Sequence, residues 1–295
     1  MRVKSVYFAV VILVASTLFV SLASAQNPDT LMPEQSIAKG QQILADLINA
    51  LGGPGYTEVR ESECSGRRVL FGHNGEPVGN IGFAELRHYP DKVRTEYVGK
   101  GHFTLLPYLI GLDGLDLTHG GIVVTLYNAN HGWSYDRGGV NELPAASISD
   151  FQEQVKRNID NLLRLRLLEP GMAIRFGGND TVDLKQVDWV EITDSEERKF
   201  RLAVDRSTHR LIRSVVTTKD EENQQINDDV SIYTNYQLKD SVWTPLQISR
   251  EHNGRRAMQI FYDTCRYNPG FADNVFDKST LSKQVSQALA KKSKN

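Results

Sequence analysis

The stretch that decides the fold begins Val187-Asp-Trp-Val-Glu-Ile192 and ends at Tyr267. It holds six short runs in which apolar side chains occupy alternate positions or nearly so, and such alternation places them on one face of a β-sheet. Polar turn formers such as Asn253-Gly254 separate consecutive runs, so we expect hairpins and an antiparallel meander. The six runs are residues 187–192, 200–205, 211–216, 230–236, 243–249 and 257–262.

Further strands and two helices are expected upstream of this meander. Residues 56–98 alternate with a period of two and predict three strands, the first two separated by the turn Gly72-His-Asn-Gly75. Residues 37–51 carry apolar side chains at helical spacing and end at Gly52-Gly53. Residues 148–167 predict a longer helix, for which Ser147 is the expected N-cap.

Length and charge exclude some classes of function. The chain has 295 residues, enough for one large core or two modest ones. Its 34 basic and 36 acidic residues nearly cancel, which gives a formal net charge of -2. A protein that binds nucleic acid needs a clustered basic surface. We therefore expect no nucleic-acid partner.

The first 25 residues have the pattern of a signal peptide. Arg2 and Lys4 precede an apolar run at 6–22, and Ala23-Ser-Ala25 follows as a small-x-small cleavage pattern. An uncleaved membrane anchor is the alternative, which the cleavage pattern disfavours. We expect a signal peptide at 1–25, one domain at 26–278 and a polar, disordered tail at 279–295. The mature protein is then exported to the periplasm.

The two cysteines, Cys64 and Cys265, are the only pair in the chain. Export favours their oxidation. Cys64 lies in the first predicted strand and Cys265 lies at or just after the last, so a disulfide would tie the two ends of the sheet together. Two buried free thiols are the alternative. A metal site is disfavoured because no histidine is spaced to complete it.

Residues 99–121 fit neither the helical nor the strand period. They are apolar and rich in glycine, and connections this long are uncommon in compact domains. Three interpretations remain open: a mobile lid, a loop that touches a membrane, or a short helix packed on the core.

Sequence motifs of catalysis are missing. The chain has no nucleophile elbow, phosphate-binding loop or His-Glu-x-x-His motif. Its seven histidines are scattered, and its carboxylates cluster in turns, where solvation explains them. We therefore expect no catalytic residues, no metal and no cofactor, and hence a protein that is not an enzyme.

Several short motifs, in their order and spacing, resemble a known family. They are Tyr89-Pro-Asp-Lys-Val-Arg94, Tyr127-Asn with Gly132-Trp-Ser-Tyr-Asp136, Leu202-Ala-Val-Asp205-Arg-Ser-Thr208, and Asn235-Tyr236 with Val242-Trp-Thr-Pro245. The chain resembles, over most of residues 36–267, the LolA/LolB-type superfamily of periplasmic lipoprotein carriers, especially the outer-membrane lipoprotein-sorting-like proteins. The segment at 99–121 and the helix at 148–167 depart from the compact carriers, and the lipid-modified cysteine of the LolB type is missing.

The resemblance implies an α+β fold, an open and strongly curved antiparallel half-barrel with helices covering its concave face. It also implies an apolar cavity that holds acyl chains. Arg94 matches the arginine that latches the lid helix in the carriers, although a surface arginine is the alternative. Residues expected to line the cavity, each of which could instead belong to a filled core, are Phe83, Val93, Tyr97, Val124, Leu126, Trp133, Phe151, Val155, Ile159, Leu162, Trp189, Leu202, Val204, Tyr236, Trp243, Ile248 and Ile260.

The function expected from this resemblance is that of a non-catalytic periplasmic carrier or binding protein. Its ligand would be the acyl chains of a lipid or lipoprotein, with an inner- or outer-membrane protein as a further partner. The alternative is an envelope sensor or scaffold that uses the same fold to bind proteins. An enzyme on lipid or glycan is a third class, which would require two titratable groups to converge in the cavity. The ligand's identity and the oligomeric state are left open.

Overall fold

The computed structural model describes residues 31–99, 121–136, 138–219 and 224–282. The expected signal peptide, the interior of the 99–121 segment and residues 283–295 lie outside these ranges. In the described part of the chain, thirteen strands form one sheet whose neighbouring strands are all antiparallel. The order across the sheet is β6-β5-β4-β3-β2-β1-β13-β12-β11-β10-β9-β8-β7.

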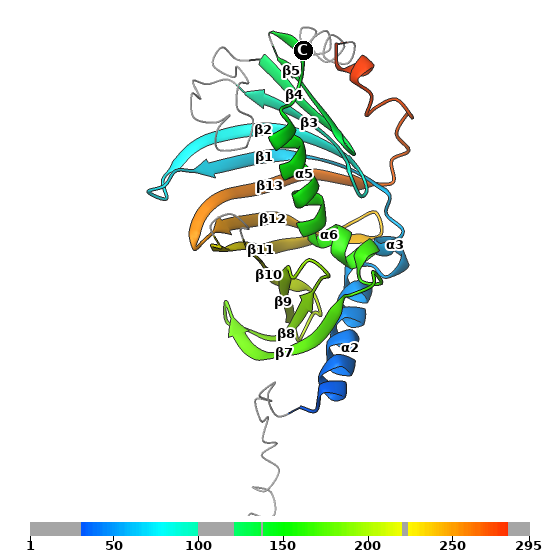
Figure 1. Ribbon diagram of the computed structural model, residues 1–295, viewed down its shortest axis with the longest axis vertical. Helices are drawn as coiled ribbons and strands as arrows, with labels where there is room; N and C mark the ends of the chain where they lie inside the picture. The colour runs from blue at the N-terminus through cyan, green and yellow to red at the C-terminus, as the bar shows by residue number, and fades with distance from the viewer. Residues whose placement is uncertain (1–30, 100–120, 137, 220–223, 283–295) are drawn as a thin grey trace, which may run out of the picture.

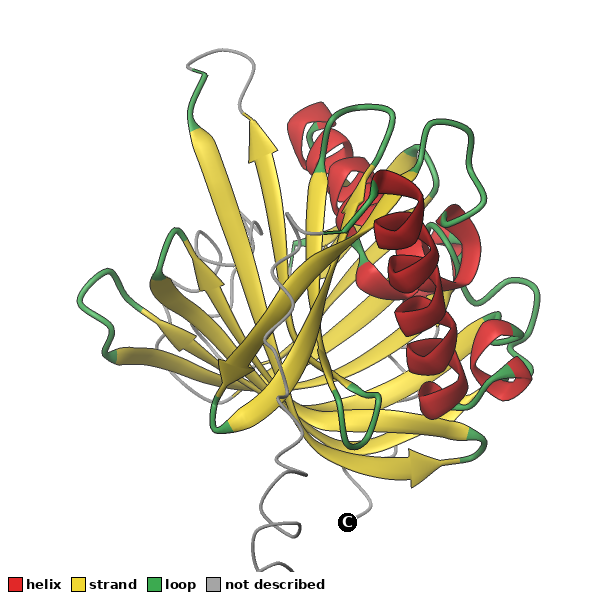
Figure 2. Cartoon of the chain, turned by 90° about the horizontal axis from the view of Figure 1, so that it is seen from below, coloured by secondary structure: helices red, strands yellow, loops and turns green. Residues whose placement is uncertain are grey.

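The sheet consists of two meanders that meet where the first and last strands pair. One meander contains β1 (Glu61–Phe71), β2 (Pro77–His88), β3 (Lys92–Gly99), β4 (Gly121–Asn128), β5 (His131–Asp136) and β6 (Gly139–Glu142). The other contains β7 (Ala173–Val182), β8 (Lys185–Thr193), β9 (Lys199–Asp205), β10 (Leu211–Lys219), β11 (Ile226–Lys239), β12 (Val242–His252) and β13 (Arg255–Tyr267). The sheet curves into an open half-barrel with helices on its concave side (Figures 1 and 2). The predicted fold class is confirmed.

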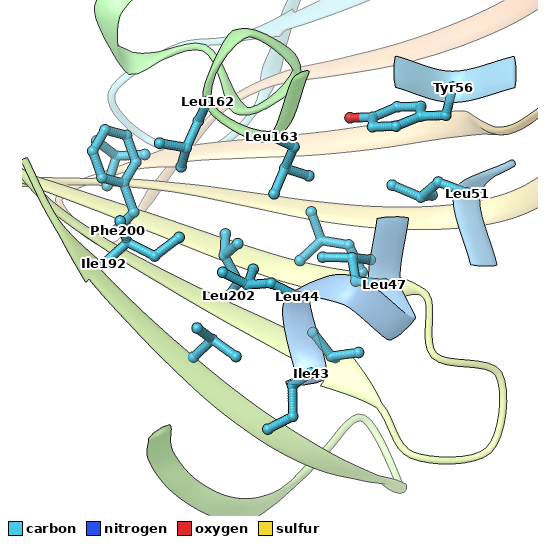
Figure 3. Close-up of a cluster of buried hydrophobic side chains, with 14 of the residues drawn as sticks. Ile43, Leu44, Leu47, Leu51, Tyr56, Leu162, Leu163, Ile192, Phe200 and Leu202 are labelled. Atoms are coloured by element: carbon cyan, nitrogen blue, oxygen red, sulfur yellow. The ribbon is translucent and has the colours of Figure 1, made fainter. Parts of the chain in front are cut away.

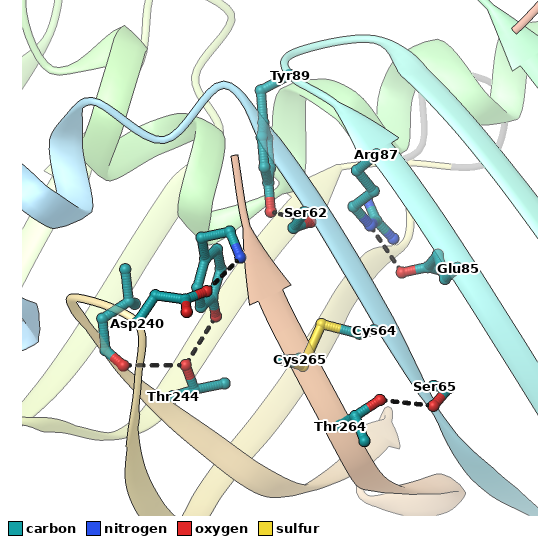
Figure 4. Close-up of a disulfide and its surroundings, with 12 residues drawn as sticks. Ser62, Cys64, Ser65, Glu85, Arg87, Tyr89, Asp240, Thr244, Thr264 and Cys265 are labelled. Atoms are coloured by element: carbon teal, nitrogen blue, oxygen red, sulfur yellow. Dashed lines mark hydrogen bonds and ion pairs between the residues drawn. A yellow bond between two sulfur atoms is a disulfide. The ribbon is translucent and has the colours of Figure 1, made fainter. Parts of the chain in front are cut away.

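A disulfide joins the two meanders in the middle of the sheet. Cys64 on β1 and Cys265 on β13 are direct cross-strand partners and are bonded to each other (Figure 4). The predicted bridge is confirmed, but its expected place at the two ends of the sheet was wrong. The first and last strands are central neighbours, because the chain enters and leaves the sheet at the same point.

A β-bulge lies next to the disulfide: Ser65 and Gly66 of β1 pair with Thr264 and Tyr262, which leaves Asp263 of β13 as the extra residue. A side chain cannot be accommodated at Gly66, because a Cβ there would overlap the carbonyl oxygen of Phe261 on β13. Bulges increase the local twist of a strand pair. This glycine therefore allows β1 and β13 to pair closely where the sheet bends.

The N-terminal helix α2 (Pro33–Leu51) fills the concave side of the second meander. Its apolar face, which includes Leu44 and Leu47, packs against Phe200 and Leu202 of β9 (Figure 3). The short helix α3 (Pro54–Thr57) follows and buries Tyr56 in the same cluster. The predicted helix at 37–51 is confirmed, and this half of the concavity is solid core.

Helix α5 (Ala145–Arg157) crosses the concave side of the sheet (Figure 1). The prediction of one helix at 148–167 was wrong, because the backbone of Asn158 is extended and its side chain caps a new turn, accepting from the Asn161 N–H at 2.9 Å. Helix α6 (Ile159–Asn161) and the π-helical turn η2 (Leu162–Arg166) continue from this break. The expected N-cap Ser147 instead lies inside α5, which begins after Pro144.

The convex face of the first meander is covered by the C-terminal segment. Val275, Phe276 and Leu281 pack against Val124 and Leu126 of β4. The turn η3 (Lys278–Thr280) belongs to this segment, and Leu281 is fully buried. The packed domain therefore extends beyond the predicted end at residue 278. Among the described residues, no helix is both long and apolar enough to cross a membrane.

Candidate ligand cavity

A cavity of about 630 Å³ separates helix α5 from the concave face of the sheet. Its wall is formed by β1 to β4 on one side and by β10 to β13 on the other, and α5 with α6 closes it above. Helix α2 fills the concavity only on the β7 side of β10. The space between α5 and the sheet therefore stays open.

Tyrosines are the most distinctive residues of the cavity wall. Eight of the eleven tyrosines in the chain line it: Tyr56, Tyr89, Tyr97, Tyr127, Tyr233, Tyr236, Tyr262 and Tyr267. Burial raises the pKa of Tyr127 and of Tyr262 to about 12. These hydroxyls therefore stay protonated at neutral pH and can act as hydrogen-bond donors. The wall combines apolar rings with polar tips, which suits an amphipathic ligand.

Two arginines share one carboxylate on the sheet wall of the cavity. Glu85 on β2 receives a bond from Arg68 Nη2 of β1 at 2.6 Å and from Arg87 Nε at 2.7 Å. Burial alone would raise the pKa of Glu85, but the charges of Arg87 and Arg68 outweigh it and lower the pKa to about 2. We call these three residues the charged triad. It is ionised at neutral pH and carries a net charge of +1.

The middle of helix α5 is held by an aromatic contact. Phe151 of α5 stacks on Tyr127 of β4, with ring centroids 4.2 Å apart and planes 11° from parallel. Gln152 also donates to Asn130, in the β4–β5 turn, at 2.8 Å. These contacts fix the middle of α5 over the first meander.

The last turn of α5 is held by ion pairs with the second meander. Arg157 lies 3.5 Å from Asp229 of β11, and Glu153 accepts from Arg198 at 2.9 Å. Arg198 is buried and also bonds Asp194 at 3.0 Å in the β8–β9 turn. Helix α5 thus bridges the two halves of the curved sheet.

A buried arginine stabilises the break after α5. The Arg164 guanidinium lies between the rings of Tyr56 and Tyr89, 4.3 and 4.7 Å from their centroids. It pairs with Asp160, which also accepts from the Tyr56 hydroxyl at 2.9 Å. Cation–π contacts of this kind strengthen when they are desolvated. The segment after the break, α6 and η2, is therefore more firmly held than α5 itself.

The structure brings nine of the seventeen predicted lining residues to the cavity. They come from β3, α5, α6, β11, β12 and β13: Val93, Tyr97, Phe151, Val155, Ile159, Tyr236, Trp243, Ile248 and Ile260. Leu162, Leu202 and Val204 lie in the filled core under α2, and Phe83 packs beside the cavity against Arg68. Trp189 lies in a separate cluster with Val187 and Ala203.

The remaining three predicted lining residues belong to the convex face. Leu126 is the cross-strand partner of Trp133, and both pack with Val124 under the C-terminal segment. Alternation along β4 and β5 correctly groups these residues on one face. It does not identify that face as the convex one, because the C-terminal segment buries the convex face as well.

Arg94 lies in this same convex row, opposite Leu126 in the register of β3 and β4. Its side chain is buried and contacts Glu96 at 2.9 Å and Thr280 Oγ1 at 3.5 Å. The prediction that Arg94 latches the lid helix placed it on the wrong face. It holds the C-terminal segment, and the contacts of α5 come from Tyr127, Asn130, Asp229 and Arg198.

The sequence analysis missed the charged triad, although a signal for it was present. Glu85 and Arg87 follow Ile81 and Phe83 at alternate positions of β2, so the period of two places them on the buried face. Burying a charge is costly unless the charge is paired, so charged residues among buried positions of a strand indicate a paired cluster. Among the described residues, no group of three or more His, Cys, Asp or Glu side chains could hold a metal ion.

Comparison with known proteins gives structural relatives only. No family model matches the chain, and no curated protein matches its sequence. The structure of a DUF1329 family protein from Desulfovibrio piger is similar at a TM-score of 0.54, with 13% sequence identity, covering 83% of this chain and 99% of that one. A LolA superfamily protein from Nitrosomonas europaea matches at a TM-score of 0.49 with 11% identity, covering 82% of this chain and 99% of that one.

The first of these matches shows a shared fold. The open, curved antiparallel sheet with helices on its concave side is the architecture that the resemblance implied, and the fold prediction is confirmed.

Proposed function

We propose that this protein is a non-catalytic carrier or binding protein that holds acyl chains of a lipid or lipoprotein in the cavity under α5. The observation that supports this most is the cavity itself. Its volume of about 630 Å³ lies within the range of roughly 300–1,000 Å³ typical of small-molecule sites. Apolar side chains from both the sheet and α5 line it, including Ile248, Ile260 and Val155.

The energetics favour such a ligand. Burying an acyl chain gains about 0.8 kcal/mol per methylene, so a chain of ordinary length binds well in a dry groove. Loading and release require the roof to open. Helix α5 is attached through one aromatic stack and one hydrogen bond at its middle and through a few ion pairs towards its C-terminal end, which suits an element that opens at modest cost.

The compartment proposed for this function is the periplasm. The signal-like N-terminus and the Cys64–Cys265 disulfide both support export to an oxidising compartment. There the protein would receive its ligand from, or deliver it to, a membrane partner protein.

A cavity-filling substitution tests where the acyl chain binds. Val155→Trp places a large ring from α5 into the cavity, and we expect the affinity for a fluorescent fatty acid to fall by at least about tenfold. Val78→Trp is the matched control, since Val78 is exposed on β2 outside the cavity. Equal affinity of the wild type and both variants would place the ligand elsewhere. No binding by the wild type would leave the protein-binding sensor or scaffold as the better account.

A further inference from the structure

We propose that the cavity selects amphiphiles whose head group carries a negative charge, a carboxylate or a phosphate, and that Arg68 and Arg87 bind this group. The inference rests on the proposed function and adds the chemistry of the ligand's polar end. It starts from the charged triad, in which two guanidinium groups share the single carboxylate of Glu85. Figure 4 shows one of these contacts, between Arg87 and Glu85.

Within the described residues, Glu85 is the only carboxylate bonded to either arginine, so no second bonded carboxylate balances the charge of the triad. Nearer the roof, Asp229 pairs with Arg157 and Asp160 pairs with Arg164, while Asp150 and Glu251 also line the cavity. The side chains of Arg68 and Arg87 are 11% and 29% exposed, and a partly buried cation that lacks a full counter-charge is destabilising. A bound anion would supply that counter-charge.

Hydrogen-bond donors are also available at the triad. Within the described residues, Arg87 donates only through Nε, which leaves both of its Nη groups for a ligand. Arg68 donates from Nη1 to the Tyr97 hydroxyl at 2.8 Å, and its buried Nε has no partner. Tyr97 accepts this bond, so its own O–H proton is free to point into the cavity. Carboxylate and phosphate oxygens accept such bonds well, and arginine binds them with matching planar geometry.

The surroundings of the triad are apolar, as an amphiphile requires. The Arg68 guanidinium lies 4.2 Å from the centroid of the Phe83 ring, and Ile248 and Ile260 belong to the same buried cluster. Both isoleucines also line the cavity. A head group at Arg87 would therefore leave the ligand's chain against aliphatic and aromatic side chains.

The test compares ligands that share a chain and differ in the head group. Laurate, dodecyl phosphate and dodecanol would each displace a fluorescent fatty acid from the wild type and from Arg87→Gln. We expect at least one anion to bind the wild type about tenfold or more tighter than dodecanol, the difference expected for charge-assisted hydrogen bonds. Arg87→Gln reduces the triad to a neutral Arg68–Glu85 pair and should remove that preference, so that the anions and dodecanol bind the variant about equally.

Arg175→Gln is the matched control. It removes the same charge from an exposed side chain on β7 that does not line the cavity. The two anions separate a carboxylate head from a phosphate head. Equal affinity of the wild type for both anions and dodecanol would overturn this inference while the carrier function stands, and this comparison does not depend on the folding of any variant. Competition by inorganic phosphate as strong as by dodecyl phosphate would overturn it too, because the site would then bind a free anion. Failure of all three ligands would instead overturn the proposed function.

Discussion

At the scale of single residues, Glu85 connects stability with the candidate site. Its pKa of about 2 lies below its ordinary value of 4.5, so the ionised carboxylate stabilises the folded state. The contribution is fully present above about pH 4.5 and is lost as the pH falls towards 2. The size of the shift corresponds to about 3 kcal/mol.

Glu85→Gln should remove this pH dependence. The wild type's free energy of unfolding, measured with urea at about pH 5 and about pH 2, should fall by about 3 kcal/mol more than that of the variant. Glu191→Gln is a control, since this carboxylate pairs with the largely exposed Arg175. An unchanged pH dependence in Glu85→Gln would show that the carboxylate is not held by the two arginines.

Residue patterns identified which side chains share a face, but not which face holds the cavity. Val93 and Tyr97 alternate with Arg94 along β3, and the structure places the first two in the cavity and Arg94 on the convex side. The sequence pattern is equally consistent with Arg94 in the cavity and with Val93 and Tyr97 on the convex side. The reason is that both faces of the first meander are buried, one by α5 and the other by residues 271–282, and this covering depends on tertiary packing.

At the scale of elements, α5 is the part of the molecule that the proposed function requires to move. Phe151→Ala removes its stacked contact with Tyr127, a loss of about 3 kcal/mol for a buried phenylalanine. Amide hydrogen exchange in residues 145–157 should then become about 100-fold faster, while exchange in β12 and β13 stays unchanged.

Ser149→Ala is the matched control for this prediction, because Ser149 is exposed on the same helix. Faster exchange throughout the sheet in Phe151→Ala would contradict the prediction, since it would mean that α5 opens only when the whole domain unfolds.

Element boundaries were predictable where the local pattern decides them. Helix α2 ends at Gly52 as expected, because glycine adopts a positive φ of 136° there. The break at Asn158 was missed, since the apolar spacing of Phe151, Val155 and Ile159 continues through it as if the helix did. A bulge between Phe176 and Gly178 lets β7 run as one strand from Ala173 to Val182.

At the scale of the whole molecule, the disulfide is the covalent link between the two meanders. It closes a loop of 201 residues, and in the chain-entropy model its removal costs up to about 5 kcal/mol. The double variant Cys64→Ser, Cys265→Ser should therefore unfold at a lower urea concentration by a corresponding amount. Reduction of the wild type should give the same result, whereas unfolding midpoints that coincide would contradict a stabilising role for the bridge.

The whole architecture was predictable from hairpin signals and family resemblance, but the character of the cavity was not. The runs between 187 and 267 became β8 to β13 in the expected antiparallel order. The apolar cavity that the resemblance implied is instead lined by eight tyrosines and a charged triad as well as by aliphatic side chains. These groups come from α3, from β1 to β4 and from β11 to β13, which are far apart in the sequence, so no local pattern reports their proximity.

Native mass spectrometry of the protein purified from the cells that naturally produce it, followed by organic extraction, tests directly whether it carries a ligand. The account predicts one bound lipid or acylated peptide per protein molecule, and Val155→Trp purified in the same way should carry much less. An empty wild-type protein with an intact fold would contradict the carrier function.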